Sequence, residues 1–334
     1  MMLIHPRSRI IVFIACVLLL VICFFSSILL GYTNTSFSSL VHSFTQFNGS
    51  NEHLVIQNVR IPRAIIASIV GASLAIAGLF MQVLTKNPLA SPSVLGINAG
   101  ASMLIVLSIT FFHLQSPNAT IWLAFLGATI SAVFVFGLSS LGKDGATPIK
   151  ITLAGVSIAA MFSSITQGLL VTNEVALEQV LFWLAGSVQG RSLDSLHMVL
   201  PYIVIAWVIS LAIGGKINTF MLGDDVSKAL GQNTALLKVT LVVLVIILAG
   251  GAVSISGPIG LVGIIVPQIV RMFVKNDYRW MIPFCGIFGA ILLLLADVAS
   301  RYILMPEETP VGIMTAVIGA PFFIYLARKG GTVK

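Results

Sequence analysis

Charged residues are scarce in this chain of 334 residues, and their scarcity excludes a water-soluble protein. Only 9% of the residues are Asp, Glu, Lys or Arg, whereas 57% are hydrophobic. A soluble globular domain carries about 25% charged and about 45–50% apolar residues. A soluble fold of this length could not bury so much apolar surface, so the composition indicates a polytopic membrane protein.

Cysteine is also rare, and motifs for metals and nucleotides are missing. Cys16, Cys23 and Cys285 lie within apolar runs without CxxC spacing, which favours neither a disulfide framework nor a zinc site. The five histidines show no ligand spacing, and neither Gly-Lys pair of the chain is followed by the Ser or Thr of a P-loop. We therefore expect no cofactor and no metal site, and we expect any ATP hydrolysis to occur on another subunit.

Long apolar runs are the dominant feature of the chain. A helix needs about 20 apolar residues to cross a bilayer, with a range of roughly 17–25. The sequence predicts ten spans, of which 97–112 and 259–274 are the weakest: 10–31, 64–84, 97–112, 120–141, 151–171, 198–214, 239–256, 259–274, 281–300 and 311–327. The predicted fold class is an all-α polytopic membrane protein with about ten transmembrane helices.

The basic residues orient these spans. With the N-terminus inside, 14 of the 18 Lys and Arg residues fall on the cytoplasmic side, and only Arg60, Arg63, Arg191 and Arg301 remain outside. This is the asymmetry of the positive-inside rule, so both termini are predicted to be cytoplasmic. It also explains the net charge of +7 without a nucleic-acid partner.

Two segments between the predicted spans differ from short connecting loops. Residues 172–196 lie outside and contain an apolar stretch too short to cross, which predicts a re-entrant or interfacial helix. Residues 215–238 form the longest cytoplasmic loop. The chain has no low-complexity segment or long linker, so residues 1–334 are predicted to form a single transmembrane domain.

Ionisable groups at membrane depth are few. Asp297 precedes Arg301 by four residues, a spacing that lets the two side chains pair on one helix face. Without a buried carboxylate relay, a proton- or sodium-coupled transporter has little support. The uncharged Thr166 and Gln167 could line a pathway or bond between helices.

Arg60 and Arg63 flank Pro62 just before the second span, on the predicted outer side. Arginine pairs bidentately with carboxylates, so Arg60, Arg63 and Arg301 suggest a docking site for an acidic partner. The alternative is interfacial snorkelling near lipid phosphates.

The cytoplasmic stretch 222–231 predicts a short isolated helix. Asp224 and Asp225 lie at its start, where the helix dipole favours anions, and Gly231 is a natural C′ residue. Val226, Ala229 and Leu230 form one apolar face. This face must either pack on the chain's own spans or enter a cleft on a partner.

Several motifs in order make the chain resemble the FecCD family of ABC importer permeases, which carry ferric siderophores, haem and cobalamin. The resemblance covers nearly the whole length. Besides the two loops above, the motifs are Gly71-Ala72-Ser73-Leu74-Ala75 with Gly78 and Gln82, Asn87-Pro88-Leu89-Ala90, Leu95-Gly96, Gly257-Pro258-Ile259-Gly260 with Gly263 and Pro267, Leu295-Ala296-Asp297, Glu307, Pro310-Val311-Gly312 and Gly319-Ala320-Pro321-Phe322-Phe323.

The resemblance implies a multi-pass protein of the bacterial plasma membrane that pairs with a second permease subunit, identical or paralogous. A cytoplasmic ABC ATPase dimer and an extracytoplasmic substrate-binding protein would be its other partners, within membrane lipid. Arg60, Arg63 and Arg301 match the family's docking arginines. Thr147 lies near the family's cytoplasmic gate, although Pro148 and Ile149 interrupt the local match.

The family resemblance also assigns the segment that meets the ATPase. That segment contains Leu222, Gly223, Asp224, Asp225, Val226, Ala229, Leu230 and Gly231.

One motif departs from the family pattern, because Gln268 follows Pro267 where a histidine is usual. A role that needs an imidazole is therefore in doubt, whereas a hydrogen-bonding role survives. The favoured function is a non-enzymatic permease subunit for an iron–siderophore complex. Cobalamin or haem import is the alternative within the family, and an ion-coupled secondary transporter is the alternative from another class.

Overall fold

The computed structural model describes residues 6–31, 35–112, 114, 116–142, 145–172, 174–304 and 307–330, and within these ranges every regular element is a helix. The elements are α1 (Pro6–Leu29), α2 (Phe37–Thr45), α3 (Asn51–Val55), η1 (Ile56–Arg60), α4 (Ile61–Thr85), η2 (Pro92–Leu95), α5 (Ile97–Phe112), α6 (Pro117–Ser139), α7 (Pro148–Thr172), α8 (Glu174–Leu184), α9 (Leu193–Phe220), α10 (Asp224–Ala229), α11 (Thr234–Val245), η3 (Ile246–Gly250), α12 (Gly251–Ser256), α13 (Val262–Val274), α14 (Tyr278–Ser300) and α15 (Val311–Gly330).

The all-α polytopic architecture predicted from the sequence is confirmed. Seven helical segments of the described chain are long and apolar enough to cross a membrane, and they include the run Thr234–Ser256, which contains the π-helical segment η3. Three predicted spans correspond to the shorter apolar helices Ile97–Phe112, Val262–Val274 and Val311–Ile324. That all ten cross the bilayer therefore stays a prediction.

The predicted span 259–274 begins later than expected, at Val262. Gly257 adopts φ +71° and Pro258 has no amide proton, so the helix before them ends and cannot be resumed at once. The non-helical stretch that results packs against the segment after α8. A Cβ at Gly257 would lie only 2.2 Å from the carbonyl oxygen of Trp183, which explains the glycine.

Helix α4 forms the centre of the fold, and two glycines let its neighbours approach. A Cβ at Gly71 would lie 2.3 Å from the carbonyl oxygen of Gly289 in α14, and one at Gly78 would lie 2.0 Å from that of Gly263 in α13. Between membrane helices, where the hydrophobic effect contributes little, small residues stabilise packing by close backbone contact. The glycines of the sequence motif 71–78 are therefore packing positions.

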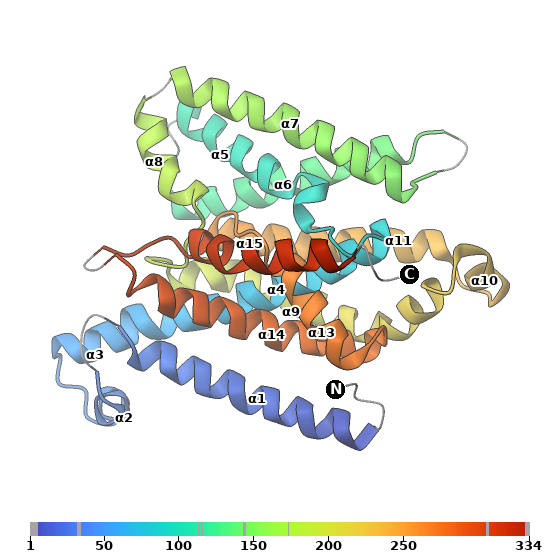
Figure 1. Cartoon of the computed structure of the whole chain (residues 1–334). Helices are drawn as coiled ribbons and strands as arrows, with labels where there is room; N and C mark the ends of the chain where they lie inside the picture. The colour runs from blue at the N-terminus through green and yellow to red at the C-terminus, as the bar shows by residue number, and fades with distance from the viewer. Residues whose placement is uncertain are drawn as a thin grey trace.

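The long helices run roughly alongside one another between two ends of the molecule (Figure 1). One end carries α2, α3 and α8 and is called the α8 end. The opposite end carries α10 and is called the α10 end; α1 begins toward it. The connections 172–196 and 215–238 thus lie at opposite ends, as the predicted topology requires.

The peripheral helices leave much of their apolar surface uncovered. In the most apolar 18-residue stretch of each helix, only 17% of α1, 28% of α7 and 33% of α9 is buried inside the protein. The corresponding share for the segment that contains α4 is 83%. Apolar faces of this size on described helices require lipid or another subunit as their surroundings.

Candidate functional site

The three arginines predicted to dock a partner gather at the α8 end. Arg60 ends η1, Arg63 lies in the first turn of α4, and Arg301 follows α14. Each side chain is buried, with a residue exposure of 4%. The sequence predicted that these residues lie on one side of the membrane, and in the structure they form a single internal cluster.

Two of these arginines cap the C-terminus of α1. Arg60 Nη1 donates to the carbonyl oxygens of Ile28 and Leu29 at 2.8 and 2.9 Å. Arg301 Nη1 donates to those of Ser27 and Leu30, both at 2.7 Å. The last carbonyls of a helix lack intrahelical partners and carry the negative end of its dipole, so two guanidinium groups stabilise this helix end.

Asp297 is fully buried and accepts hydrogen bonds from two of the arginines. Its Oδ1 accepts from Arg63 Nε at 2.7 Å, and its Oδ2 accepts from Arg301 Nη2. The predicted pair Asp297–Arg301 is therefore confirmed. Arg63 also binds Glu308 at 2.5 Å, a carboxylate that the sequence analysis did not single out. We call these four side chains, together with Arg60, the arginine cluster. Its predicted docking role stays a prediction, because direct contact with a partner would compete with these internal acceptors.

The predicted coupling segment presents an exposed apolar stripe at the α10 end. Leu222, Val226 and Leu230 are 65%, 47% and 65% exposed. Val226 and Leu230 are four residues apart in α10 and at its C-cap, so they share one face, and Leu222 lies just before the helix, ahead of Gly223. Of the two arrangements expected for the face of Val226, Ala229 and Leu230, burial against the chain's own spans does not occur, because all three residues are exposed. Gly231 has φ +78°, the left-handed conformation expected at C′.

The segment is nevertheless fixed to the spans through Asp224. Its Oδ2 lies 3.2 Å from Lys238 Nζ in α11, and its Oδ1 lies 3.5 Å from Lys86 Nζ at the end of α4. Burial by itself raises the Asp224 pKa, but the hydrogen bond and charge of Lys238, with Lys86, outweigh it and lower the pKa overall.

The buried Ser227 is a second anchor of the segment. The Ser227 hydroxyl is buried and is placed to donate to the carbonyl oxygens of Gly223 and Thr219, at 2.7 and 2.9 Å. The short helix is thus tied to α4, α9 and α11. The sequence indicated the acidic start of α10, but not the two lysines that meet it, because they lie far away along the chain.

The three pathway candidates differ in position. Thr166 is buried and its hydroxyl donates to the carbonyl oxygen of Phe162 within α7 at 2.8 Å. Gln167, one residue later, is exposed on the other face of α7. Thr147 precedes α7, where its Oγ1 accepts from the amide of Lys150 at 3.4 Å. Of the two α7 residues, only Gln167 presents its side chain to the surroundings of the chain.

Gln268 stands where the family usually has histidine, and it has the hydrogen-bonding role that the sequence analysis kept for it. Its amide nitrogen donates to the carbonyl oxygen of Pro88 at 2.5 Å, and its Oε1 accepts from Arg271 Nη1 at 3.2 Å. Arg271 Nη2 in turn donates to Gln82 Oε1 in α4 at 3.2 Å. The network joins α13 to α4 and to the loop behind it.

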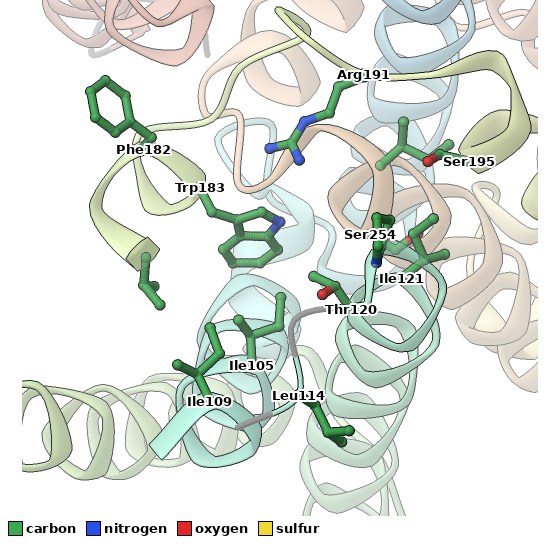
Figure 2. A pocket seen from close by; sticks show the side chains of 13 residues that line it. Ile105, Ile109, Leu114, Thr120, Ile121, Phe182, Trp183, Arg191, Ser195 and Ser254 are labelled. Atoms are coloured by element: carbon green, nitrogen blue, oxygen red, sulfur yellow. The ribbon is translucent and has the colours of Figure 1, made fainter. Parts of the chain in front are cut away.

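A cavity of about 450 Å³ lies at the α8 end between α5, α6, α8 and the start of α9 (Figure 2). Arg191 and Trp183 line it together with Ser195, Thr120 and Ser254. The sequence placed Arg191 outside and gave it no role. No group of three or more His, Cys, Asp or Glu that could hold a metal occurs within the described ranges.

Comparison with known proteins gives consistent matches. The sequence model of the FecCD transport family matches residues 19–329. The chain is 55% identical to the "Probable siderophore transport system permease protein YfiZ" of Bacillus subtilis, covering 97% of both chains. It is 39% identical to the Fe(3+)-citrate import system permease protein YfmD of the same organism, over 99% of this chain and 98% of the relative.

A solved structure agrees with these sequence matches. A chain from an inward-facing metal-chelate type ABC transporter superposes with a TM-score of 0.84 at 28% identity, covering 96% of this chain and 99% of the other.

Proposed function

The chain belongs to the FecCD transport family, and we propose that it is the membrane-spanning permease subunit of an ATP-driven importer for a ferric siderophore. It is a multi-pass protein of the bacterial plasma membrane and not an enzyme. The relatives named above are permeases of siderophore and ferric citrate systems, which supports the iron chelate as cargo.

The observation that carries the proposal is the exposed apolar stripe of the coupling segment. Leu222, Val226 and Leu230 face outward while Asp224 and Ser227 fix the same short helix to the spans. A partner that binds the stripe can therefore pull on α4, α9 and α11 together. This arrangement supports an ATPase dimer docked at the α10 end, with residues 215–238 as the coupling loop.

The remaining topology follows from the same proposal. The α10 end is cytoplasmic, all ten predicted spans cross the bilayer, and both termini lie inside, with residues 1–334 as one permease domain. Segment 172–196, with α8, is a re-entrant or interfacial element on the outer side. The extracytoplasmic binding protein docks at the α8 end, where the arginine cluster holds α1, α4 and α14 in register beneath it.

A second permease subunit, identical or paralogous, completes the pathway. The exposed apolar face of α7, which includes Ile149, Leu153 and Val156, supports α7 as the part that meets it. In this arrangement Gln167 lies at the subunit interface or on the pathway, and Thr147 lies near its cytoplasmic end.

Transport by reconstituted vesicles tests the proposal. Vesicles with this chain and its ATPase, given the loaded binding protein, should accumulate ferric siderophore only with internal ATP. Vesicles with the chain alone should transport nothing. Uptake by the chain alone, driven by a proton or sodium gradient, would establish the secondary transporter instead, and uptake of haem or cobalamin in place of ferric siderophore would establish the other cargo.

A further inference from the structure

Arg191 differs from the other three arginines on the predicted outer side. Arg63 and Arg301 bind Asp297, and Arg60 caps α1, whereas no carboxylate in the described part of the chain pairs with Arg191. Its Nε donates to the carbonyl oxygen of Ser187 at 3.3 Å, and neither terminal nitrogen has an acceptor among the described residues. Burial lowers the pKa of this guanidinium, so a nearby anion would stabilise its charged form.

Trp183 supplies a second unused donor beside it. The residue is 6% exposed, and its Nε1 is buried without an acceptor among the described residues. An indole nitrogen can only donate, so nothing but an acceptor can satisfy it. Figure 2 shows the Arg191 guanidinium and the Trp183 indole nitrogen directed into the same cavity.

The hydroxyl groups around the cavity do not satisfy these donors. Thr120 Oγ1 donates to the carbonyl oxygen of Ser116 at 3.1 Å, and Ser254 Oγ donates to that of Gly251 at 2.9 Å. Both hydroxyl hydrogens are thus directed to backbone carbonyls, and neither hydroxyl oxygen accepts from Trp183 Nε1, which has no partner among the described residues. The cavity therefore offers a guanidinium and an indole N–H together, with aliphatic walls such as Ile105. A cationic group with a second, directed donor fits an oxyanion.

The donors are held in place by the backbone. The amide of Gly186 donates to the carbonyl oxygen of Trp183 at 3.1 Å, and the amide of Ser187 donates to that of Ser256 at 2.8 Å. Ser187 then orients Arg191 through its own carbonyl oxygen. The segment between α8 and α9 is thereby fastened to the end of α12, so a ligand would meet a formed site.

We propose that this cavity is a subsite for an oxyanion and that its occupant in the importer is a carboxylate-bearing ferric chelate. The second statement rests on the proposed function. The cavity volume of about 450 Å³ lies within the range of roughly 300–1,000 Å³ typical of small-molecule sites and exceeds the needs of a lone headgroup phosphate. The outer position places the subsite where cargo arrives.

Direct binding tests the subsite without the ATPase or the binding protein. The full chain is placed in nanodiscs of phosphatidylcholine and titrated with radiolabelled ferric citrate, with an uncharged ferric trihydroxamate as the comparison ligand. The wild-type chain should bind ferric citrate saturably, and metal-free citrate should compete. Binding of the uncharged chelate should be at least about tenfold weaker.

Two variants remove one donor each. Arg191→Gln should weaken ferric citrate binding at least about tenfold, and Trp183→Phe, which keeps an aromatic ring, about threefold or more. Arg7→Gln is the matched control, because it removes an exposed arginine of α1 at the other end of the molecule and should change nothing. Circular dichroism on each variant checks that the helices are intact.

The outcomes separate the alternatives. Equal ferric citrate affinity in wild type and Arg191→Gln overturns the subsite. If wild type binds no ferric citrate but retains phosphatidylglycerol in native mass spectrometry, and Arg191→Gln loses that lipid, a headgroup is the occupant and the chelate assignment is wrong. Failure of the proposed function would appear elsewhere, as absence of ATP-driven ferric chelate uptake by the complete wild-type importer.

Discussion

Arg63 Nε lies 2.7 Å from Asp297 Oδ1, and this contact joins the first turn of α4 to the end of α14 across 234 positions of the sequence. Both side chains are almost fully buried, at 5% and 0% exposed. Asp297 also binds Arg301, so one carboxylate bridges two guanidinium groups. The pairing makes the arginine cluster a structural element of the α8 end, whatever else docks there.

Asp297→Asn should therefore be strongly destabilising. Removing one partner from a buried ion pair costs about 3–5 kcal/mol, because the remaining charges stay buried without compensation. Thermal unfolding in detergent, followed by thiol labelling of the buried Cys285, measures the loss. Glu308→Gln is the control, since the Glu308 side chain is 26% exposed and water can replace it in part. Equal losses in the two variants would contradict the assignment.

The glycines of α4 give a second prediction. Gly78→Ala should destabilise or misassemble the protein, because the added Cβ would lie 2.0 Å from the carbonyl oxygen of Gly263. Gly137→Ala in α6 is the matched control, as its Cβ would meet nothing within 4 Å. There alanine should be neutral or stabilise by up to about 1 kcal/mol through helix propensity. The same thermal assay decides, and a Gly78→Ala protein as stable as wild type would refute the close contact.

The sequence predicted the architecture well because membrane helices must satisfy their backbone hydrogen bonds locally. The runs that became α1, α6, α7 and α14 could be read from apolar length alone. The late start of α13 could not, because it depends on Gly257 lying against Trp183, a contact between distant segments. The π-helical segment η3 between α11 and α12 was not predicted either, although the pair Gly250-Gly251 stands at its end and small-residue pairs favour helix irregularities.

For the sites, the sequence predicted the contacts within one helix but not those made by packing between helices. The pair Asp297–Arg301 lies within one helix and follows from spacing, whereas Arg63 reaches Asp297 only through helix packing. Likewise, Asp224 was noticed as a helix start, but Lys86 and Lys238 approach it from other helices. Arg191 could have drawn attention as an isolated basic residue on the predicted outer side, although nothing in the sequence places Trp183 beside it.

The ion pairs of Asp224 should weaken in acid but stay unchanged by pH changes near neutrality. Its pKa is lowered in the folded protein, so its contribution to stability is complete above the unfolded value of about 3.9 and is lost as the pH falls through the lower folded value. A spin label at Asp225→Cys should keep constant mobility from pH 8 to pH 5 and become more mobile below about pH 4.

Asp224→Asn should raise the mobility of the same label at every pH. The effect on global stability should stay below about 1 kcal/mol, because Lys86 and Asp224 are 45% and 35% exposed and exposed ion pairs contribute little. Mobility that is unchanged by Asp224→Asn would show that the ion pairs do not hold α10.

Neighbouring positions in α7 test the route. A bulky thiol reagent should label Gln167→Cys readily and Thr166→Cys poorly, because Gln167 is exposed and Thr166 is 6% exposed. If α7 lines the pathway or the subunit interface, labelling Gln167→Cys in the assembled importer should also stop uptake. Complete labelling with undiminished uptake would place the route away from this face, and preferential labelling of Thr166→Cys would contradict the helix orientation.

The central claim is that the exposed stripe of the coupling segment connects an ATPase to the spans. The most direct measurement is ATP-dependent ferric siderophore uptake by reconstituted vesicles, made in parallel with co-purification of the ATPase. Leu230→Asp places a charge on the stripe, and Gly231→Val strains a residue at φ +78°. Lys228→Gln, an exposed change in the same helix, is the control. The account predicts that both variants insert normally but lose the ATPase or hydrolyse ATP without uptake, while the control transports as wild type does. Normal ATPase binding and normal uptake in both Leu230→Asp and Gly231→Val would contradict it.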